Sequence, residues 1–497
     1  MRSQMQWPKT TIPALSERLY TMTHSELGTE RIRTLLFKYA LPAIIAMTAS
    51  SIYNIVDSIY IGHGVGALAL SGLTIAKPLM DICAAFGSLV GVGAGTLIAI
   101  KLGEKDLLSS NKILGNVIML NLLLGVLVMV VGLLFLDPIL CAFGASADTL
   151  PFAHDYMAII LYGNVTTHIY FGLNNMLRST GHPMKSMTAT ILAVVINMVL
   201  DPIFIFGLDM GVRGAALATV LSQCIAIIWQ VTVFFNTKEP IHFQKGIWSL
   251  DRSLTLTMLS IGLSPFLMNL ASCFVMVILN NQLKRYGGDL AIASFGVVNR
   301  LVFVFFMIVM GLNQGMQPIA SYNYGARQMD RVKRVFQLTA YAASIITTVV
   351  TLLGEICPQL VVQLFTHDEE LIAASSYALR IIVCAFFVVG FQSVVTNLFT
   401  ALGMAKKAIF LSLSRQVLIL VPLCMLLPLI PAGDGVWGLD GVWWAWPIAD
   451  ACASMLAAVL LMRQMRAFQQ MHLSQQQLLA ANERFLSDDF PQDDSAR

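Results

Sequence analysis

Charged side chains are scarce in this chain of 497 residues, in which Asp, Glu, Lys and Arg together make up 12%. Soluble domains usually carry about 25% charged residues. With 57% hydrophobic residues and a mean hydropathy of +0.73, the composition predicts a polytopic membrane protein whose main surroundings are the lipid bilayer. The net charge of +3 is small and no basic run with interleaved aromatics occurs, so nucleic acid is excluded as a partner.

Paired cysteines, hydrolase motifs and a secretory leader are also missing. The eight cysteines stand singly with no C-x-x-C pair, which is typical of packed free thiols rather than of disulfides or a metal site. Without an H-E-x-x-H motif or a nucleophile–base pair, an enzyme embedded in the membrane has little support, and no cofactor is expected. The first stretch of the chain is polar, so no cleavable signal peptide is predicted.

Long apolar stretches occupy most of the chain, and runs of about 20 residues or more predict twelve membrane-spanning helices. Their approximate cores are 34–62, 75–100, 113–136, 152–177, 186–207, 214–236, 256–281, 291–321, 335–357, 371–402, 408–430 and 441–462. Basic residues such as Lys101 and Lys105 gather on alternate connections, whereas acids such as Asp368 and Glu369 dominate the others. The positive-inside rule therefore predicts that both termini are cytoplasmic.

The two halves of the chain repeat at a constant offset of 222 residues. The matched pairs are Gly66 and Gly288, Gly93 and Gly315, Gly103 and Gly325, Phe143 and Phe365, Asn175 and Asn397, Gly181 and Gly403, and Lys185 and Lys407. The repeat predicts two pseudo-symmetric six-helix lobes in parallel orientation, related by an axis along the membrane normal. The expected divisions are an N-terminal tail 1–33, an N-lobe 34–237, a linker 238–255, a C-lobe 256–463 and a C-terminal tail 464–497.

The first predicted span carries an acid near the middle of the membrane. At helical spacing, Ser50, Asn54 and Asp57 fall on one face, and isoleucines cover most of the rest. A carboxylate at the bilayer centre costs about 2.5–3.5 kcal/mol even on a lenient insertion scale. Asp57 is therefore predicted to be functional, and the alternative is a buried polar group that stabilises helix packing.

The fifth and sixth spans supply further polar groups. Asn197 and Asp201 stand four residues apart and so share a helix face, and Pro202 is expected to bend the helix beside Asp201. Thr219 adds a hydroxyl from the sixth span. Together with Asp57, these residues form an all-oxygen set that suits a hard cation such as Na⁺. The same carboxylates, desolvated and close together, could carry a proton instead.

The repeat assigns this acidic chemistry to one lobe. The positions matched to Asp57 and Asp201 are Leu279 and Leu423. Further charged residues lie near helix ends, where structural or gating roles are favoured, and the hypothetical pairs are Asp81 with Arg300 and Asp450 with Arg415.

Several motifs resemble those of bacterial MATE (multidrug and toxic compound extrusion) transporters, and most closely their DinF- and MepA-like branch. The motifs are Leu27-Gly28-Thr29-Glu30, Lys38-Tyr39-Ala40-Leu41-Pro42-Ala43-Ile44-Ile45, Tyr53-Asn54-Ile55-Val56-Asp57, Asn313-Gln314-Gly315-Met316-Gln317-Pro318-Ile319 and Tyr322-Asn323-Tyr324-Gly325-Ala326. The similarity covers about residues 27–463. The family's N-lobe cation site maps onto Asp57, Asn197, Asp201 and Thr219. No acids occur in the seventh and tenth spans, so a C-lobe site of the NorM type is not expected.

The resemblance implies a V-shaped, monomeric, multi-pass protein of the bacterial inner membrane. It implies export of small amphipathic or cationic compounds in exchange for H⁺ or Na⁺, by alternating access. Candidates for lining the substrate cavity are Tyr53, Asn54, Asn175, Met198 and Met276. The alternatives are an exporter of one specific metabolite, or a flippase of a lipid-linked precursor. A flippase would favour a strongly basic cavity, whereas the mid-span charges identified here are chiefly acidic.

Overall fold

A computed structural model describes residues 26–432 and 435–489. Most of the predicted N-terminal tail, and the end of the predicted C-terminal tail, lie outside the described residues. The described chain is helical apart from a small antiparallel pair in which Pro431 faces Val436.

The helices follow one another in chain order, and several crossings contain a short break or a change of helix type. The elements of the first half are α2 (Ile32–Gly64), α3 (Ala67–Gly103), α4 (Leu107–Leu134), α5 (Leu136–Ala142), α6 (Leu150–Tyr162), α7 (Asn164–Ser179), α8 (Pro183–Pro202), the π-helix η1 (Ile203–Gly207) and α9 (Val212–Phe234). Those of the second half are α10 (Arg252–Gly325), α11 (Met329–Ile356), α12 (Pro358–Val362), α13 (Glu369–Val383), α14 (Phe387–Ala401), α15 (Ala405–Leu413), the π-helix η2 (Ser414–Leu420), α16 (Val421–Leu426), the 3₁₀ turn η3 (Leu427–Leu429), β1 (Pro431–Ala432), β2 (Gly435–Val436) and α17 (Leu439–Asp489).

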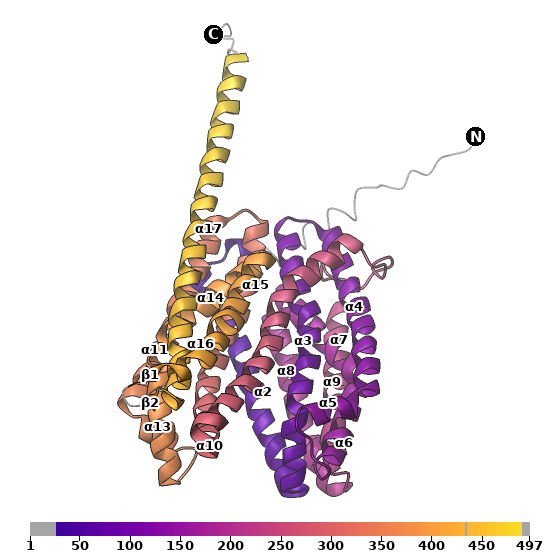
Figure 1. The fold of residues 1–497 in the computed structure, drawn as a ribbon. Helices are drawn as coiled ribbons and strands as arrows, with labels where there is room; N and C mark the ends of the chain where they lie inside the picture. Colours follow the sequence, from indigo (N-terminus) through magenta and orange to yellow (C-terminus); the bar gives the residue numbers. More distant parts are fainter. Residues whose placement is uncertain (1–25, 433–434, 490–497) are drawn as a thin grey trace, which may run out of the picture.

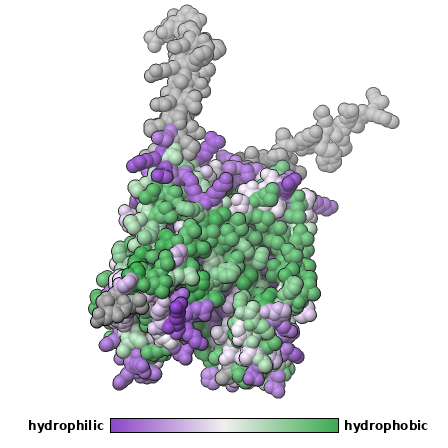
Figure 2. Space-filling model, viewed as in Figure 1, coloured by the Kyte–Doolittle hydropathy of each residue, from purple (hydrophilic) through white to green (hydrophobic). Residues whose placement is uncertain are grey.

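The predicted twelve spans are confirmed. Nine helical stretches in the described part of the chain are long and apolar enough to cross a membrane, and the pair α13 and α14, bent by 53°, adds a tenth. The long helix α10 is really two crossings, because Gly288 has a left-handed φ of +63° and interrupts it. Helices α6 and α7, which meet at Gly163, form the remaining crossing. Figure 2 shows a hydrophobic band between two polar ends, as a bilayer requires.

The backbone repeats the internal symmetry of the sequence. Left-handed φ values occur at matched positions in both halves: +111° at Gly66 and +63° at Gly288, and +94° at Gly181 and +69° at Gly403. The same holds for two non-glycine residues that are also 222 apart, Lys105 at +62° and Arg327 at +58°. Residues other than glycine rarely adopt a positive φ. Its occurrence at both Lys105 and Arg327 therefore shows that the matched turns have the same geometry.

The two halves lie side by side and share a hydrophobic core at only one end (Figure 1). This shared core contains Leu35 and Leu97 from the first half together with Met316 and Leu398 from the second. Toward the other end, each half has its own core, one built within residues 61–216 and the other within 275–449. The lobes are therefore joined at the end where α2 begins and part toward the opposite end, as expected for a V shape.

Glycines allow the lobes to touch at the joined end. A Cβ atom on Gly103 would lie 2.1 Å from the carbonyl oxygen of Tyr322, and one on Gly325 would lie 2.1 Å from that of Ile100. These two contacts are images of each other under the 222-residue repeat, so α3 and α10 cross at the pseudo-two-fold axis. A Cβ atom on Gly93 would likewise lie 1.9 Å from the carbonyl oxygen of Met258. Only residues without a side chain permit helices to approach so closely.

Candidate ion-binding site

Three helices of the first lobe bring together the residues that were predicted to bind a cation. Asp57 lies on α2, Asn197 and Asp201 lie on α8, and Thr219 lies on α9. All four are buried: Asp57 is 6% exposed, Asn197 2%, Asp201 0% and Thr219 7%. At Pro202 the α-helix α8 ends and the chain continues as the π-helix η1, whereas the bend expected there stays a prediction. Such π-segments are frequent at functional sites.

Asn197 links the α8 acid to α9. Its Nδ2 donates to Asp201 Oδ1 and to Thr219 Oγ1, each at 3.3 Å. The Thr219 hydroxyl in turn donates to the carbonyl oxygen of Ala215 at 3.1 Å, and Tyr53 Oη lies 3.5 Å from Thr219 Oγ1. Because the single hydroxyl hydrogen of Thr219 is already donated, Tyr53 must be the donor in that contact.

Three oxygens of this cluster have no hydrogen-bond partner among the described residues: Asp57 Oδ1, Asn197 Oδ1 and Asp201 Oδ2. A buried acceptor without a donor costs about 1–3 kcal/mol, and more if it is charged. The two carboxylates also lie within electrostatic reach of each other. A hard cation or a proton would satisfy these oxygens, so the residues present fit either coupling ion.

Tyr156 is a neighbour of the site that the sequence did not identify. It lies on α6, is 1% exposed, and is within electrostatic reach of Asp57, Asp201 and Tyr53. Its segment also holds the polar residues His154 and Asp155, and the repeat matches Tyr156 with Ala378. No feature of the sequence singles Tyr156 out, and only the position of α6 in the fold assigns it here.

The candidates for the substrate cavity do not form one cluster. Tyr53 is half-buried beside the ion site, and Asn54 is exposed and donates to Ser50 O at 2.7 Å. Asn175 accepts a hydrogen bond from Arg178 at 2.5 Å. Of the two methionines, Met198 is half-buried on α8, while Met276 packs against the separate core of the second lobe. Their role in binding a substrate stays a prediction.

One of the two hypothetical charge pairs is confirmed and the other is wrong. Arg415 Nε donates to Asp450 Oδ1 at 2.7 Å, and the Asp450 side chain is 3% exposed. Asp81 instead forms an ion pair with Lys77, four residues earlier on α3, and Arg300 is exposed. Lys77 is favoured over a distant partner because residues four apart on a helix already lie next to each other.

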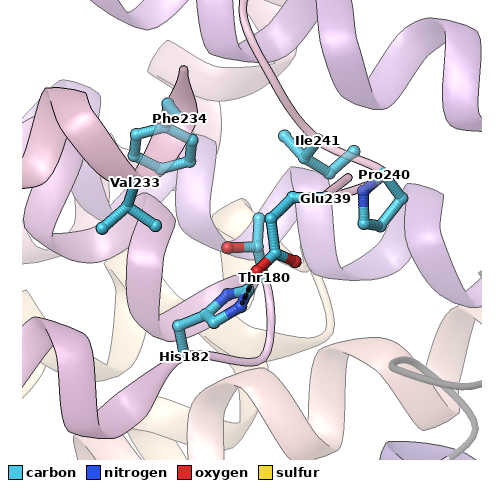
Figure 3. Close-up of a pocket in the computed structure, with 7 residues that line it drawn as sticks. All are labelled: Thr180, His182, Val233, Phe234, Glu239, Pro240 and Ile241. Carbon is cyan, nitrogen blue, oxygen red and sulfur yellow. Dashed lines mark hydrogen bonds and ion pairs between the residues drawn. The ribbon is translucent and has the colours of Figure 1, made fainter. Parts of the chain in front are cut away.

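A small pocket lies where the linker between the lobes begins (Figure 3). Glu239 Oε1 is 3.1 Å from His182 Nε2 and 3.2 Å from Lys185 Nζ. The hydrogen bond from His182, its charge when protonated, and Lys185 lower the pKa of Glu239 to about 2. Asn111 also donates to Pro240 O at 3.1 Å, so the start of the linker is tied to the first lobe.

Sequence comparison assigns the family. The MatE family model matches residues 42–203 and 261–426, one stretch in each lobe. The chain belongs to the MATE family. It is 30% identical over 425 residues to the multidrug export protein MepA of Staphylococcus haemolyticus (strain JCSC1435), covering 85% of this chain and 91% of that protein. MepA of Staphylococcus aureus (strain MSSA476) is 29% identical, with 86% and 92% covered.

Solved structures agree with this assignment. The MATE multidrug transporter DinF-BH is 36% identical and superposes with a TM-score of 0.81, covering 89% of this chain and 98% of that one. An outward-facing MATE family transporter of the MOP superfamily is 24% identical with a TM-score of 0.82, over 90% and 98%, and shows the fold alone. The protein is thus a multi-pass transporter of the bacterial inner membrane rather than an enzyme.

Proposed function

We propose that the protein is a secondary active multidrug exporter that exchanges amphipathic or cationic compounds for H⁺ or Na⁺. The observation that carries the proposal is the cluster of three unpartnered, buried oxygens on Asp57, Asn197 and Asp201. Burying two carboxylates and an amide oxygen inside an apolar helix bundle costs free energy unless a cation binds them. The MepA relatives support export of drugs as the activity that this cation drives.

The orientation that we propose in the membrane rests on charge. Lys101 and Arg331 lie at the joined end of the lobes, and this end carries the basic loops that the positive-inside rule assigns to the cytoplasm. The ends of the described chain, the start of α2 and the end of α17, lie on the same side (Figure 1). With this proposed orientation the lobes part toward the outside, which is the arrangement expected of an outward-open state.

Helix α2 is suited to couple ion binding to the lobe movement, because it carries Asp57 and also packs against the second lobe. Its first half packs against the second lobe, where a Cβ on Gly315 would lie 2.5 Å from Ala40 Cα. Its second half carries Asp57 and exposes Ile52 and Ile55 by 52% and 57%. A cation that binds Asp57 from outside changes the charge on this helix, and a shift of α2 then acts directly on the joined end.

The driving force is sufficient for export. One charge crossing about 100 mV is worth about 2.3 kcal/mol, or a gradient of roughly fifty-fold at one-to-one exchange. Competition between cation and substrate for the N-lobe acids would couple the two fluxes.

The test is dye uptake into inverted vesicles under a pure pH gradient or a pure Na⁺ gradient. The wild type should respond to one of these gradients, which identifies the ion. Asp57→Asn should abolish ion-driven uptake while the variant stays folded and inserted. Asp81→Asn removes an acid of the same lobe that is paired with Lys77, and it should retain uptake. Wild-type uptake by Asp57→Asn would refute the proposal.

A further inference from the structure

A buried arginine lies at the joined end of the lobes without an acidic partner. Arg178, in the last turn of α7, is 8% exposed. Its guanidinium donates to two neutral amide oxygens, Gln314 Oε1 at 2.8 Å and Asn175 Oδ1 at 2.5 Å. None of the ion pairs among the described residues includes Arg178. Because arginine stays protonated in proteins, this place in the bundle carries a full positive charge.

The fold itself does not require an arginine at this position. The repeat matches Arg178 with Thr400, and it matches Ser179 at the end of α7 with Ala401 at the end of α14. The second lobe therefore ends the equivalent helix with a neutral side chain. Burying a guanidinium without a counter-ion is unfavourable, and amide oxygens offset only part of that. The charge is thus confined to the lobe that also carries the two acids of the ion site.

A file of buried polar side chains leads along α8 from the ion site toward Arg178. Asp201 and Asn197 are followed, in the direction of the joined end, by Thr190 and Ser186, and all four are buried. Their spacings of four, seven and four residues place them on one helix face. At a rise of about 1.5 Å per residue, the file is about 22 Å long.

Side chains of α7 and α2 contribute to this file. Tyr170 Oη donates to Thr190 Oγ1 at 3.3 Å, and Tyr170 is within electrostatic reach of Tyr53 at the ion site. Asn174 donates to Thr190 Oγ1 at 3.1 Å and accepts from Ser186 Oγ at 2.6 Å. Hydroxyl and amide oxygens can solvate a Na⁺ ion or, together with water, carry a proton. The file therefore offers the coupling cation a route out of the ion site.

The file reaches a cavity of about 20 Å³ between α2, α7, α8 and α10, to which both lobes contribute. A space of about 10–15 Å³ is enough for one water molecule, so a water or an ion of similar size can occupy it. The wall includes Ser186 and Thr190 from the file, together with Arg178 and Tyr39. Tyr39 is within electrostatic reach of Glu26, which is exposed at the start of the described chain. Arg178 therefore lies between the ion site and the end that we assign to the cytoplasm.

We infer that Arg178 is an electrostatic barrier that stops the coupling cation from leaking along this file into the cytoplasm. A cation within about 5 Å of a guanidinium, at an effective dielectric constant of about 20, meets a repulsion that slows its passage by about a hundredfold. Fixed positive charges exclude protons and other cations from membrane pores in the same way. The inference rests on the proposed export function and adds the residue that keeps ion flow coupled to export.

The lobe movement itself lifts the barrier. Arg178 belongs to the first lobe and its partner Gln314 to the second, so separation of the lobes at the joined end breaks this hydrogen bond and opens the cavity. Water that enters then screens the guanidinium, because the repulsion between two charges falls as the dielectric constant rises. The cation can leave toward the cytoplasm only in that conformation.

The test measures ion flux in the absence of any substrate. The purified full-length protein is reconstituted into liposomes, a membrane potential is imposed with K⁺ and valinomycin, and entry of H⁺ and of radioactive Na⁺ is followed separately. The wild type should be tight to both ions. Arg178→Gln should raise the flux of the coupling ion at least about tenfold, whereas Arg178→Lys keeps the charge and should stay within about twofold of the wild type.

Two variants at Gln314 separate the charge from the packing, and they decide the question even if Arg178→Gln does not fold. Gln314→Glu keeps the size of the side chain but places a carboxylate against Arg178, which neutralises its field, so this variant should leak. Gln314→Met removes the hydrogen bond between the lobes and leaves the charge, so it should be tight. If Arg178 only held the lobes together, Gln314→Met would leak and Gln314→Glu would not.

A double variant tests the route. Adding Asp57→Asn to Arg178→Gln removes a carboxylate from the entrance of the file and should abolish the leak. The inference is overturned by a tight Arg178→Gln variant, by equal flux in Gln314→Met and Gln314→Glu, or by a leak that persists in the double variant. Dye uptake under an ion gradient, measured in the same liposomes, tests the export proposal separately. Its absence in the wild type would contradict that proposal, whereas the substrate-free flux still decides the role of Arg178.

Discussion

The glycine contact between the lobes offers a direct test of how the two conformations are balanced. In Gly103→Ala, the new Cβ would lie 2.1 Å from Tyr322 O, and both partners are helix backbone that cannot rotate away. Since contacts below 3.0 Å are essentially never seen, α3 and α10 must separate by about 1 Å at their crossing. Overpacking of this degree typically costs about 1–3 kcal/mol.

This cost falls only on the conformation in which the lobes are joined at this end. The equilibrium between the joined and the separated arrangements should therefore shift by about 5- to 150-fold toward separation. At the opposite end the lobes should approach each other. Gly390→Ala is the matched control, because its Cβ would lie 2.6 Å from Ala343 O within one lobe. It should lower the thermal midpoint without changing the distance between the lobes.

The distance can be followed by pulsed electron paramagnetic resonance, with spin labels on exposed residues of the parting end. Ile59 and Val277, 50% and 55% exposed, place one label on each lobe. In Gly103→Ala the distance distribution should move toward shorter values, and Gly325→Ala, its counterpart in the repeat, should do the same. An unchanged distribution in both variants, or an equal change in Gly390→Ala, would refute the reasoning.

Two further predictions concern charge pairs. Glu239→Gln should destabilise the protein at pH 7 by about 1 kcal/mol after allowance for solvent screening. Because the pKa of Glu239 is lowered from 4.5 to about 2, this contribution is present above about pH 4.5 and is lost as the pH falls toward 2. The thermal midpoints of wild type and variant should therefore converge in acid. Asp450→Asn leaves the partly buried Arg415 charge without its carboxylate and should destabilise the protein by less than the about 3–5 kcal/mol typical of a fully buried charge, whereas adding Arg415→Met should recover part of the lost thermal stability. A single variant as stable as the wild type would contradict the ion-pair account.

Much of the fold could be predicted because the length and residue pattern of each helix reflect its surroundings. The break in α10 at Gly288 was visible as two apolar runs, and the common face of Asn197 and Asp201 followed from helical spacing alone. The repeat also predicts that the second lobe has no counterpart of the Asp57 site, since Leu279 stands where the first lobe has Asp57. All of these depend on length, period and offset, which are properties of the chain itself.

Contacts between helices could be predicted only in part. Asp450 pairs with Arg415 as hypothesised, but Asp81 pairs with Lys77 instead of Arg300. Tyr156 lies near the ion site, and neither periodicity nor spacing in its own segment predicted that position. A pattern tells which face of a helix is buried but not which neighbour covers it, and the choice of neighbour depends on the packing of the whole bundle.

By itself, the sequence determined the number of crossings, the two-fold repeat and the placement of both acids in the first lobe, because the bilayer imposes span length and penalises every buried charge. Only the tertiary structure decided that Asp57 on α2 lies within electrostatic reach of Asp201 on α8, with three oxygens of the cluster lacking a donor among the described residues. It also decided that Arg178 lies in a cavity between the lobes. Both results depend on helices distant in sequence packing side by side, and local periodicity does not encode that packing.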